Sequence, residues 1–210
     1  MLNKLREAQR NFGIFGAVGF FITVSAIAIQ NWQGTYLTLS QHIALSPISS
    51  VIFGFINTLT TTLIAICLLS YIAQRWNLGR NFKLLSTIIV ACLYIIGWFP
   101  HLPTETLGST IHQAAAWVLM CTIAVFAVYG AIRLWNRADR YFHAATIAYF
   151  LIAAASAVLY FCFYQTFREY VFIVESSYIL VFFCLILSMV YAADTSKLDV
   201  KKRLRGIFKH

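Results

Sequence analysis

The stretch GWFPHLPTETLGSTIHQAAAW, residues 97–117, joins two long apolar segments through a short polar turn. It contains two histidines, His101 and His112, and one carboxylate, Glu105, but no lysine or arginine. Cations are retained on the cytoplasmic side of short membrane loops, so a turn without them is expected on the opposite side. We therefore look for binding or reacting groups on the side of the molecule that holds this turn.

Two local signals predict the ends of the flanking helices. Proline disfavours helical geometry in the preceding residue, so Pro100 is expected to end the first apolar segment. Thr110, followed three residues later by Gln113, predicts a capping box that opens the next helix. His112 would then lie in the first turn of that helix, where the positive end of the helix dipole disfavours protonation of its imidazole.

The composition excludes an ordinary soluble domain. Of the 210 residues, 60% are apolar and 11% are charged, whereas soluble chains carry about a quarter charged residues. About 20 apolar residues cross a hydrocarbon core as a helix, and continuous apolar runs do not fit the alternating strands of a barrel. The sequence predicts an all-α polytopic membrane protein, a single domain over residues 1–210 with one bundle of six transmembrane helices. The spans are expected at residues 11–30, 47–71, 84–99, 111–134, 143–164 and 171–193.

Charge placement predicts the orientation of these spans. Of the 16 lysines and arginines, all but Arg168 fall in the N-terminus, in or beside the second and fourth connections, or in the C-terminal tail. Both termini are therefore expected in the cytoplasm, with the protein in the inner (plasma) membrane of a bacterium. Anionic lipid on that side accounts for the net charge of +9, so no nucleic-acid partner is required. Residues 197–210 are expected to form a basic amphipathic tail on that leaflet.

Two polar residues lie inside the apolar runs. Asn57 needs a partner or water at mid-bilayer depth; a hydrogen bond between helices is one interpretation, and lining of a polar cavity is the other. Glu175 is costly within the last span unless it is paired, hydrated or protonated, so it is a functional candidate. A structural ion pair with Arg168, seven residues earlier, is the alternative for Glu175.

Small residues predict how the helices pack. Gly13, Gly16 and Gly19 lie on one side of the first span, where they allow a neighbouring helix of the same chain to approach closely. The alanine-rich fifth span is expected to be the most central helix for the same reason. The five cysteines are interpreted as small apolar fillers of the spans. Residues 31–46, which contain Trp32, are expected to lie against the lipid headgroups.

The outer ends of the spans are expected to form a polar pocket with His112 and Glu175 as its central pair. We therefore predict an integral membrane protein that binds or handles a lipid-like or small hydrophobic ligand on the non-cytoplasmic side. Membrane lipids are its expected partners, a homo-oligomer is left open, and no enzymatic reaction is assigned. The predicted ligand-binding residues are His42, His101, His112, Glu175, Arg168 and Asn57.

Two alternatives use the same side of the membrane. Neutral imidazoles suit a divalent metal, so His42, His101 and His112 are candidate ligands of a metal-dependent membrane-embedded hydrolase. Their spacing matches no metalloprotease motif of the His-Glu-x-x-His type. A haem-binding electron-transfer membrane protein is the second alternative, with its axial ligands drawn from the same three histidines.

The Gly-x-Phe-Pro end of the third span, followed by a histidine at the head of the fourth, resembles the six-span membrane family catalogued as domain of unknown function 998. Glu175, in VFIVESSYIL, is similar to an acidic residue that such proteins often have in the last helix. The resemblance covers residues 84–193 and implies a six-helix fold without implying a reaction. After Phe-Pro, where an acidic residue is expected in the family, this chain has His101.

Overall fold

The structure is a computed structural model that describes residues 2–99, 101 and 106–195, and over these residues every regular element is helical. The predicted all-α fold is confirmed, because six helices are long and apolar enough to cross a membrane. The tail at 197–210, together with Pro100 and Glu105, lies outside the described residues. The long helices are α1 (Leu2–Gln30), α3 (Pro47–Ile66), which continues through η1 (Cys67–Ile72) and α4 (Ala73–Arg75), α5 (Gly79–Trp98), α6 (Leu107–Leu134), α7 (Arg140–Cys162) and α9 (Val171–Thr195). Two short helices, α2 (Leu39–Ala44) and α8 (Tyr164–Glu169), lie in the connections.

Helix α6 begins four residues before its predicted start at residue 111. Its N-cap is Thr106, whose hydroxyl accepts a hydrogen bond from the amide of Ser109 at 3.1 Å. The predicted capping box at Thr110 is therefore wrong, because a threonine one turn earlier already caps the helix. His112 consequently lies in the second turn, where the dipole of α6 acts on it less strongly than predicted.

Glycines allow α1 and α3 to pack closely, as the small-residue strip predicts. A Cβ at Gly16 would stand 2.8 Å from the carbonyl oxygen of Thr60 and 2.9 Å from Cγ1 of Ile64. A Cβ at Gly13 would overlap the side chain of Cys67. The strip is therefore used for contact between helices of the same chain.

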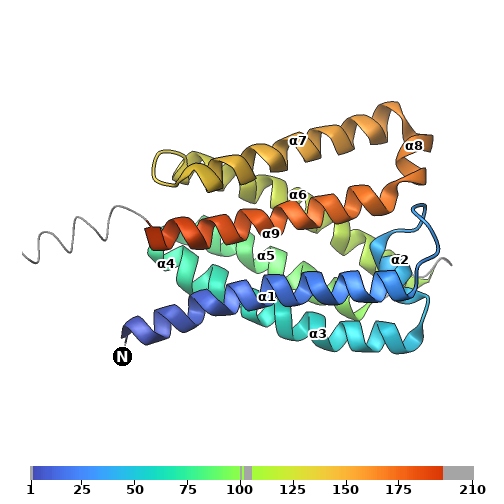
Figure 1. Cartoon of the computed structure of the whole chain (residues 1–210), viewed down its shortest axis with the longest axis horizontal. Helices are drawn as coiled ribbons and strands as arrows, with labels where there is room; N and C mark the ends of the chain where they lie inside the picture. Colours follow the sequence, from blue (N-terminus) through green and yellow to red (C-terminus); the bar gives the residue numbers. More distant parts are fainter. Residues whose placement is uncertain (1, 100, 102–105, 196–210) are drawn as a thin grey trace, which may run out of the picture.

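Helix α7 lies at the edge of the bundle, where it packs on α9 (Figure 1). The prediction that this alanine-rich segment is the most central helix is wrong. Only Phe142, Thr146 and Tyr149 are buried among its described residues, whereas Ala154 and Ala155 are exposed. Small side chains permit close packing only on the side that faces a neighbour, and most of the alanines of α7 lie on the side that faces away from the bundle.

The two ends of the bundle differ in their content. The start of α1, the α4–α5 turn, the α6–α7 turn and the end of α9 lie together at one end, which we call the basic end (Figure 1). There the guanidinium Nε of Arg75 donates to the carbonyl of Ala193 at 2.9 Å, and the indole of Trp76 donates to the carbonyl of Met189 at 3.3 Å. Helices α2 and α8 lie at the other end, which we call the α2 end.

Candidate functional site

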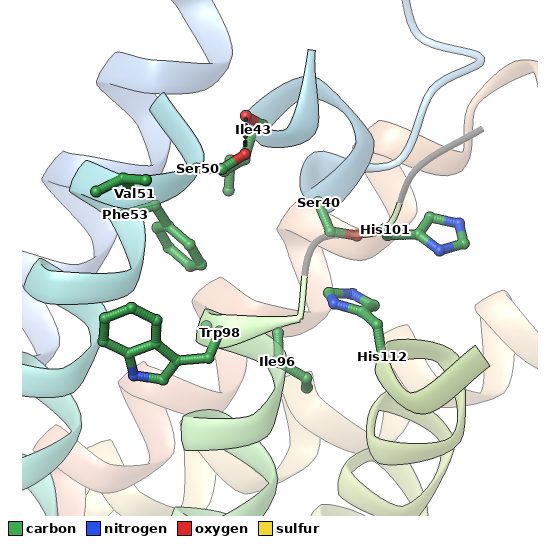
Figure 2. Close-up of a pocket in the computed structure, with 10 residues that line it drawn as sticks. Ser40, Ile43, Ser50, Val51, Phe53, Ile96, Trp98, His101 and His112 are labelled. Atoms are coloured by element: carbon green, nitrogen blue, oxygen red, sulfur yellow. Dashed lines mark hydrogen bonds between the residues drawn. The ribbon is translucent and has the colours of Figure 1, made fainter. Parts of the chain in front are cut away.

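A cavity of about 170 Å³ lies at the α2 end, between α2, α3, α5 and α6 (Figure 2). Its lining is largely apolar, with two histidines and two serines, and it contains no lysine, arginine, aspartate or glutamate among the described residues. Val51 and Trp98 are 54% and 48% exposed on the outer faces of α3 and α5, so the cavity borders the side of the bundle. The lining residues are Ser40, Ile43, Ser50, Val51, Phe53, Ile96, Gly97, Trp98, His101 and His112.

His112 stands at the end of α5, where backbone carbonyls lack helical partners. Its Nδ1 lies 2.6 Å from the carbonyl oxygen of Phe99, and because a carbonyl only accepts, this nitrogen donates the hydrogen bond. With the proton of a neutral ring on Nδ1, Nε2 is left as an acceptor.

His101 stacks on His112, with ring centroids 5.4 Å apart and planes 26° from parallel. Its Nδ1 shares a hydrogen bond of 3.1 Å with the hydroxyl of Ser109. Burial lowers the pKa of His101 below its usual value, because removal from water disfavours the charged imidazolium. Figure 2 shows the two imidazoles on the same side of the cavity, opposite Val51 and Phe53. The described lining is therefore free of carboxylates, lysines and arginines and has imidazole groups at one wall.

His42 and Glu175 belong to a separate group of contacts on the α9 side of α2. A carboxyl oxygen of Glu175 accepts a hydrogen bond of 2.7 Å from the amide of Leu39. The ring of His42 is fully buried, stacks on Trp32 at 5.3 Å and meets Phe172 of α9 at 5.1 Å. Its Nδ1 donates to the carbonyl of Thr38 at 2.9 Å. The structure does not join Glu175 to His112, because the two groups contact different elements and α2 reaches both.

Asn57 and Arg168 lie outside the cavity lining. Asn57 is buried between α3 and α5, and its Nδ2 donates to the carbonyl of Leu93 at 2.7 Å, as the helix–helix interpretation predicts. Arg168 is exposed on α8, and the chain leaves that helix at Tyr170 before α9 begins. The two residues therefore do not share a helix face, and the alternative ion pair between Arg168 and Glu175 is absent, since the carboxyl group contacts Leu39.

The three predicted metal ligands, His42, His101 and His112, do not lie close enough together to share one metal ion. Among the described residues, no group of three histidine, cysteine, aspartate or glutamate side chains is placed to hold a metal ion. His42 faces α9, whereas His101 and His112 stack on each other. Haem axial ligands face each other across the iron, and two stacked imidazoles lack that arrangement. Neither alternative gains support from the geometry of these histidines.

Helix α2 contributes a wall of the cavity that was not predicted from the sequence. Residues 31–46 were expected to lie against the headgroups, but their helix is packed into the bundle with Leu39 and Ile43 buried. The signal was present, because Thr38 and Gln41 form a capping box in which each side chain bonds the other residue's amide. A helix of six residues is too short for an apolar period to mark it.

Comparisons with models of protein families, with curated proteins and with solved structures find no match to this chain. The resemblance to domain of unknown function 998 therefore rests on the quoted residues alone.

Proposed function

We propose that this protein binds a small amphiphilic molecule, or the polar end of a lipid-like one, in the cavity at the α2 end. The polar group lies against the imidazole wall, and the apolar part extends past Val51 and Trp98 toward the lipid. The observation that carries the proposal is a cavity that borders the outer face of the bundle, has His112 on its wall and has no charged side chain among its described lining residues.

The size of the cavity limits what enters it. Pockets that enclose drug-sized ligands measure about 300–1,000 Å³, whereas this cavity measures about 170 Å³. A dry cavity of similar size, about 150 Å³, accommodates benzene. The site therefore takes a small molecule whole, or only the end of a longer chain.

Hydrogen bonding selects the polar group. Nε2 of His112 accepts a hydrogen bond in the neutral ring, because Nδ1 donates to Phe99. A carboxylate or phosphate would lack a counter-charge in this lining and would be costly to bury. The favoured ligand is consequently neutral and carries a hydroxyl or another hydrogen-bond donor.

The proposed setting is the inner membrane of a bacterium, with both termini in the cytoplasm and the cavity on the other side. The support is the gathering of the basic connections at the end of the bundle opposite α2 (Figure 1). A reporter fused to the C-terminus that is active only in the cytoplasm tests this orientation, and activity of a periplasm-specific reporter there would reverse it.

Binding is tested with bromine-labelled amphiphiles of one chain length, an alcohol and a carboxylate, which quench tryptophan fluorescence. The alcohol should quench Trp98 at lower concentration than the carboxylate, and Trp98→Phe should remove that component. His112→Ala should weaken quenching by the alcohol by about tenfold, the value of one good hydrogen bond in an apolar site.

His143→Ala is the matched control. This histidine also donates to a backbone carbonyl, that of Trp135 at 2.7 Å, but it lies in the first turn of α7, which begins at the basic end. Equal quenching by both amphiphiles, or equal loss in both histidine variants, would contradict the proposed site. Native mass spectrometry from lipid nanodiscs then identifies the molecule that co-purifies with the wild type and is depleted in His112→Ala.

A further inference from the structure

Helix α2 forms one wall of the cavity while it is held from two sides. Ser40 and Ile43 belong to the lining, and Figure 2 shows Ser40 above His112. On the α3 side, the hydroxyl of Ser50 donates to the carbonyl of Ile43 at 3.2 Å. Asn31, just after α1, donates to the carbonyl of His42 at 3.0 Å. These bonds hold the C-terminal half of α2.

The N-terminal half of α2 is held by α9. The carboxyl group of Glu175 accepts from the amide of Leu39 at 2.7 Å. Three residues earlier on α9, the amide of Phe172 donates to the carbonyl of Thr35 at 3.1 Å. The ring of Phe172 also meets those of Trp32 and His42 at 5.0 and 5.1 Å. Glu175 supplies the polar side-chain contact in this group.

A helix of six residues needs such contacts, because isolated helices shorter than about 12–15 residues are marginal in water. Within the described residues, the Glu175 side chain makes its hydrogen bond to Leu39 and is not part of an ion pair. The ion pair found there joins Arg10 and Glu7, at the far end of α1. A carboxyl group in an apolar span is costly unless it is paired, hydrated or protonated, so its presence there marks a functional candidate. Here the carboxyl group of Glu175 holds the N-terminal end of α2 against α9.

We infer that Glu175 is a positioning residue that latches α2 over the ligand cavity without touching the ligand itself. The inference rests on the proposed function for its consequence, since the latched wall is the wall of that cavity. Removal of the latch loosens the end of α2 that carries Ser40, which then keeps the contacts with Phe172 of α9. Asn31 and Ser50 still hold the other end. The cavity then opens at the α2 end and retains the amphiphile less well.

Hydrogen exchange of the α2 amides tests the latch in the full chain without any ligand. Glu175→Leu should raise the exchange rate of the peptide that covers residues 38–44 by about tenfold or more, the effect of losing a hydrogen bond to a carboxyl group. Glu175→Gln keeps an oxygen acceptor and should lie between Glu175→Leu and the wild type. Glu169→Leu, an exposed glutamate on α8, is the matched control and should exchange like the wild type.

Removal of the donor provides a second route to the same bond. Leu39 occupies the first helical position of α2, where proline is well tolerated but supplies no N–H. Thr38, with φ −65° and ψ 160°, already has the extended geometry that a following proline requires. Leu39→Pro should accelerate exchange as Glu175→Leu does, and the double variant should add little to either. Leu39→Ala reports the loss of the leucine side chain alone.

The outcomes separate the latch from the proposed function. Wild-type exchange rates in Glu175→Leu, or additive effects of Leu39→Pro and Glu175→Leu, would overturn the latch even if the amphiphile binds. Faster, non-additive exchange establishes the latch even if no amphiphile quenches Trp98, in which case the proposed function fails by itself. If the latch and the proposed function are both correct, Glu175→Leu should weaken alcohol quenching of Trp98, whereas Glu169→Leu should leave it unchanged.

Discussion

Replacement of Asn57 by alanine separates a structural role from a ligand-binding role for the polar residue in the middle of α3. Asn57 is 1% exposed, and its amide donates to the carbonyl of Leu93 at 2.7 Å. Its Oδ1 lies 3.4 Å from the hydroxyl of Thr61. A Cβ on Gly97 of α5 would overlap the Asn57 side chain, so the two helices meet at this point. We expect Asn57→Ala to destabilise the bundle and to leave ligand binding in place.

The expected loss follows from these contacts. Hydrogen bonds between membrane helices contribute about 0.6 kcal/mol on average and up to about 1.7 kcal/mol. The carbonyl of Leu93 lies within α5 and keeps its helical partner, so it is not left without a hydrogen bond. Removal of three side-chain atoms leaves a space that adds roughly 1 kcal/mol. The free energy of unfolding should therefore fall by about 1.6–2.7 kcal/mol.

Reversible unfolding in mixed micelles, followed by circular dichroism, measures that difference. The matched control is Thr62→Val, which removes another α3–α5 hydrogen bond, from Thr62 to the hydroxyl of Tyr94 at 2.7 Å, at an exposed position. Because Thr62→Val loses a hydrogen bond but leaves no buried cavity, it should lower the free energy by only about 0.6 kcal/mol. Wild-type stability of Asn57→Ala combined with lost alcohol quenching of Trp98 would refute the structural role and return Asn57 to the binding site.

Three further predictions concern packing and protonation. Because burial lowers the pKa of His101, the folded state binds fewer protons than the unfolded state below about pH 6.5; stability is therefore complete at neutral pH and falls as the pH drops through that range. The melting temperature of His101→Gln should fall less than that of the wild type between pH 7.5 and 5.5, and parallel curves would contradict this assignment. Gly16→Val should lower the free energy of unfolding by about 1–3 kcal/mol or abolish folding, whereas Gly19→Ala, whose Cβ would lie 3.3 Å from a methyl group of Thr60, should be mild. A thiol reagent that partitions into detergent micelles should label the three exposed cysteines before the protein unfolds, namely Cys121, Cys162 and Cys184. Labelling of the buried Cys67 and Cys92 before unfolding would contradict the packing of α1 and α5.

The helices were predictable because each must hide its own backbone in lipid. A span needs about 20 apolar residues in one run, and that length is visible in the chain without knowledge of any neighbour. The span predicted from residue 47 does begin there, since α3 starts at Pro47 with Ser46 as its N-cap. The glycine strip of α1 was interpreted correctly for a related reason, since small residues at helical spacing leave one face free of bulk.

The positions of the helices relative to one another were much less predictable. Alanines suggested a central α7, yet lipid is as apolar as a protein interior, so an alanine-rich face is tolerated at the edge of the bundle as well. The candidate site depended on the same missing information. His101 and His112 are close in the chain and meet in the fold, whereas Glu175 and Leu39 lie 136 residues apart and form a contact that no spacing indicates.

The sequence by itself determined that this chain is helical, how many spans it has and approximately where they lie, because the burial of backbone polar groups in lipid is a local requirement. Only the tertiary structure decided that α2 folds into the end of the bundle, that Asn57 bonds to α5, and that Glu175 contacts α2 instead of His112. Those choices depend on which side chains fit together across distant helices, and a cavity exists only where that fit is incomplete.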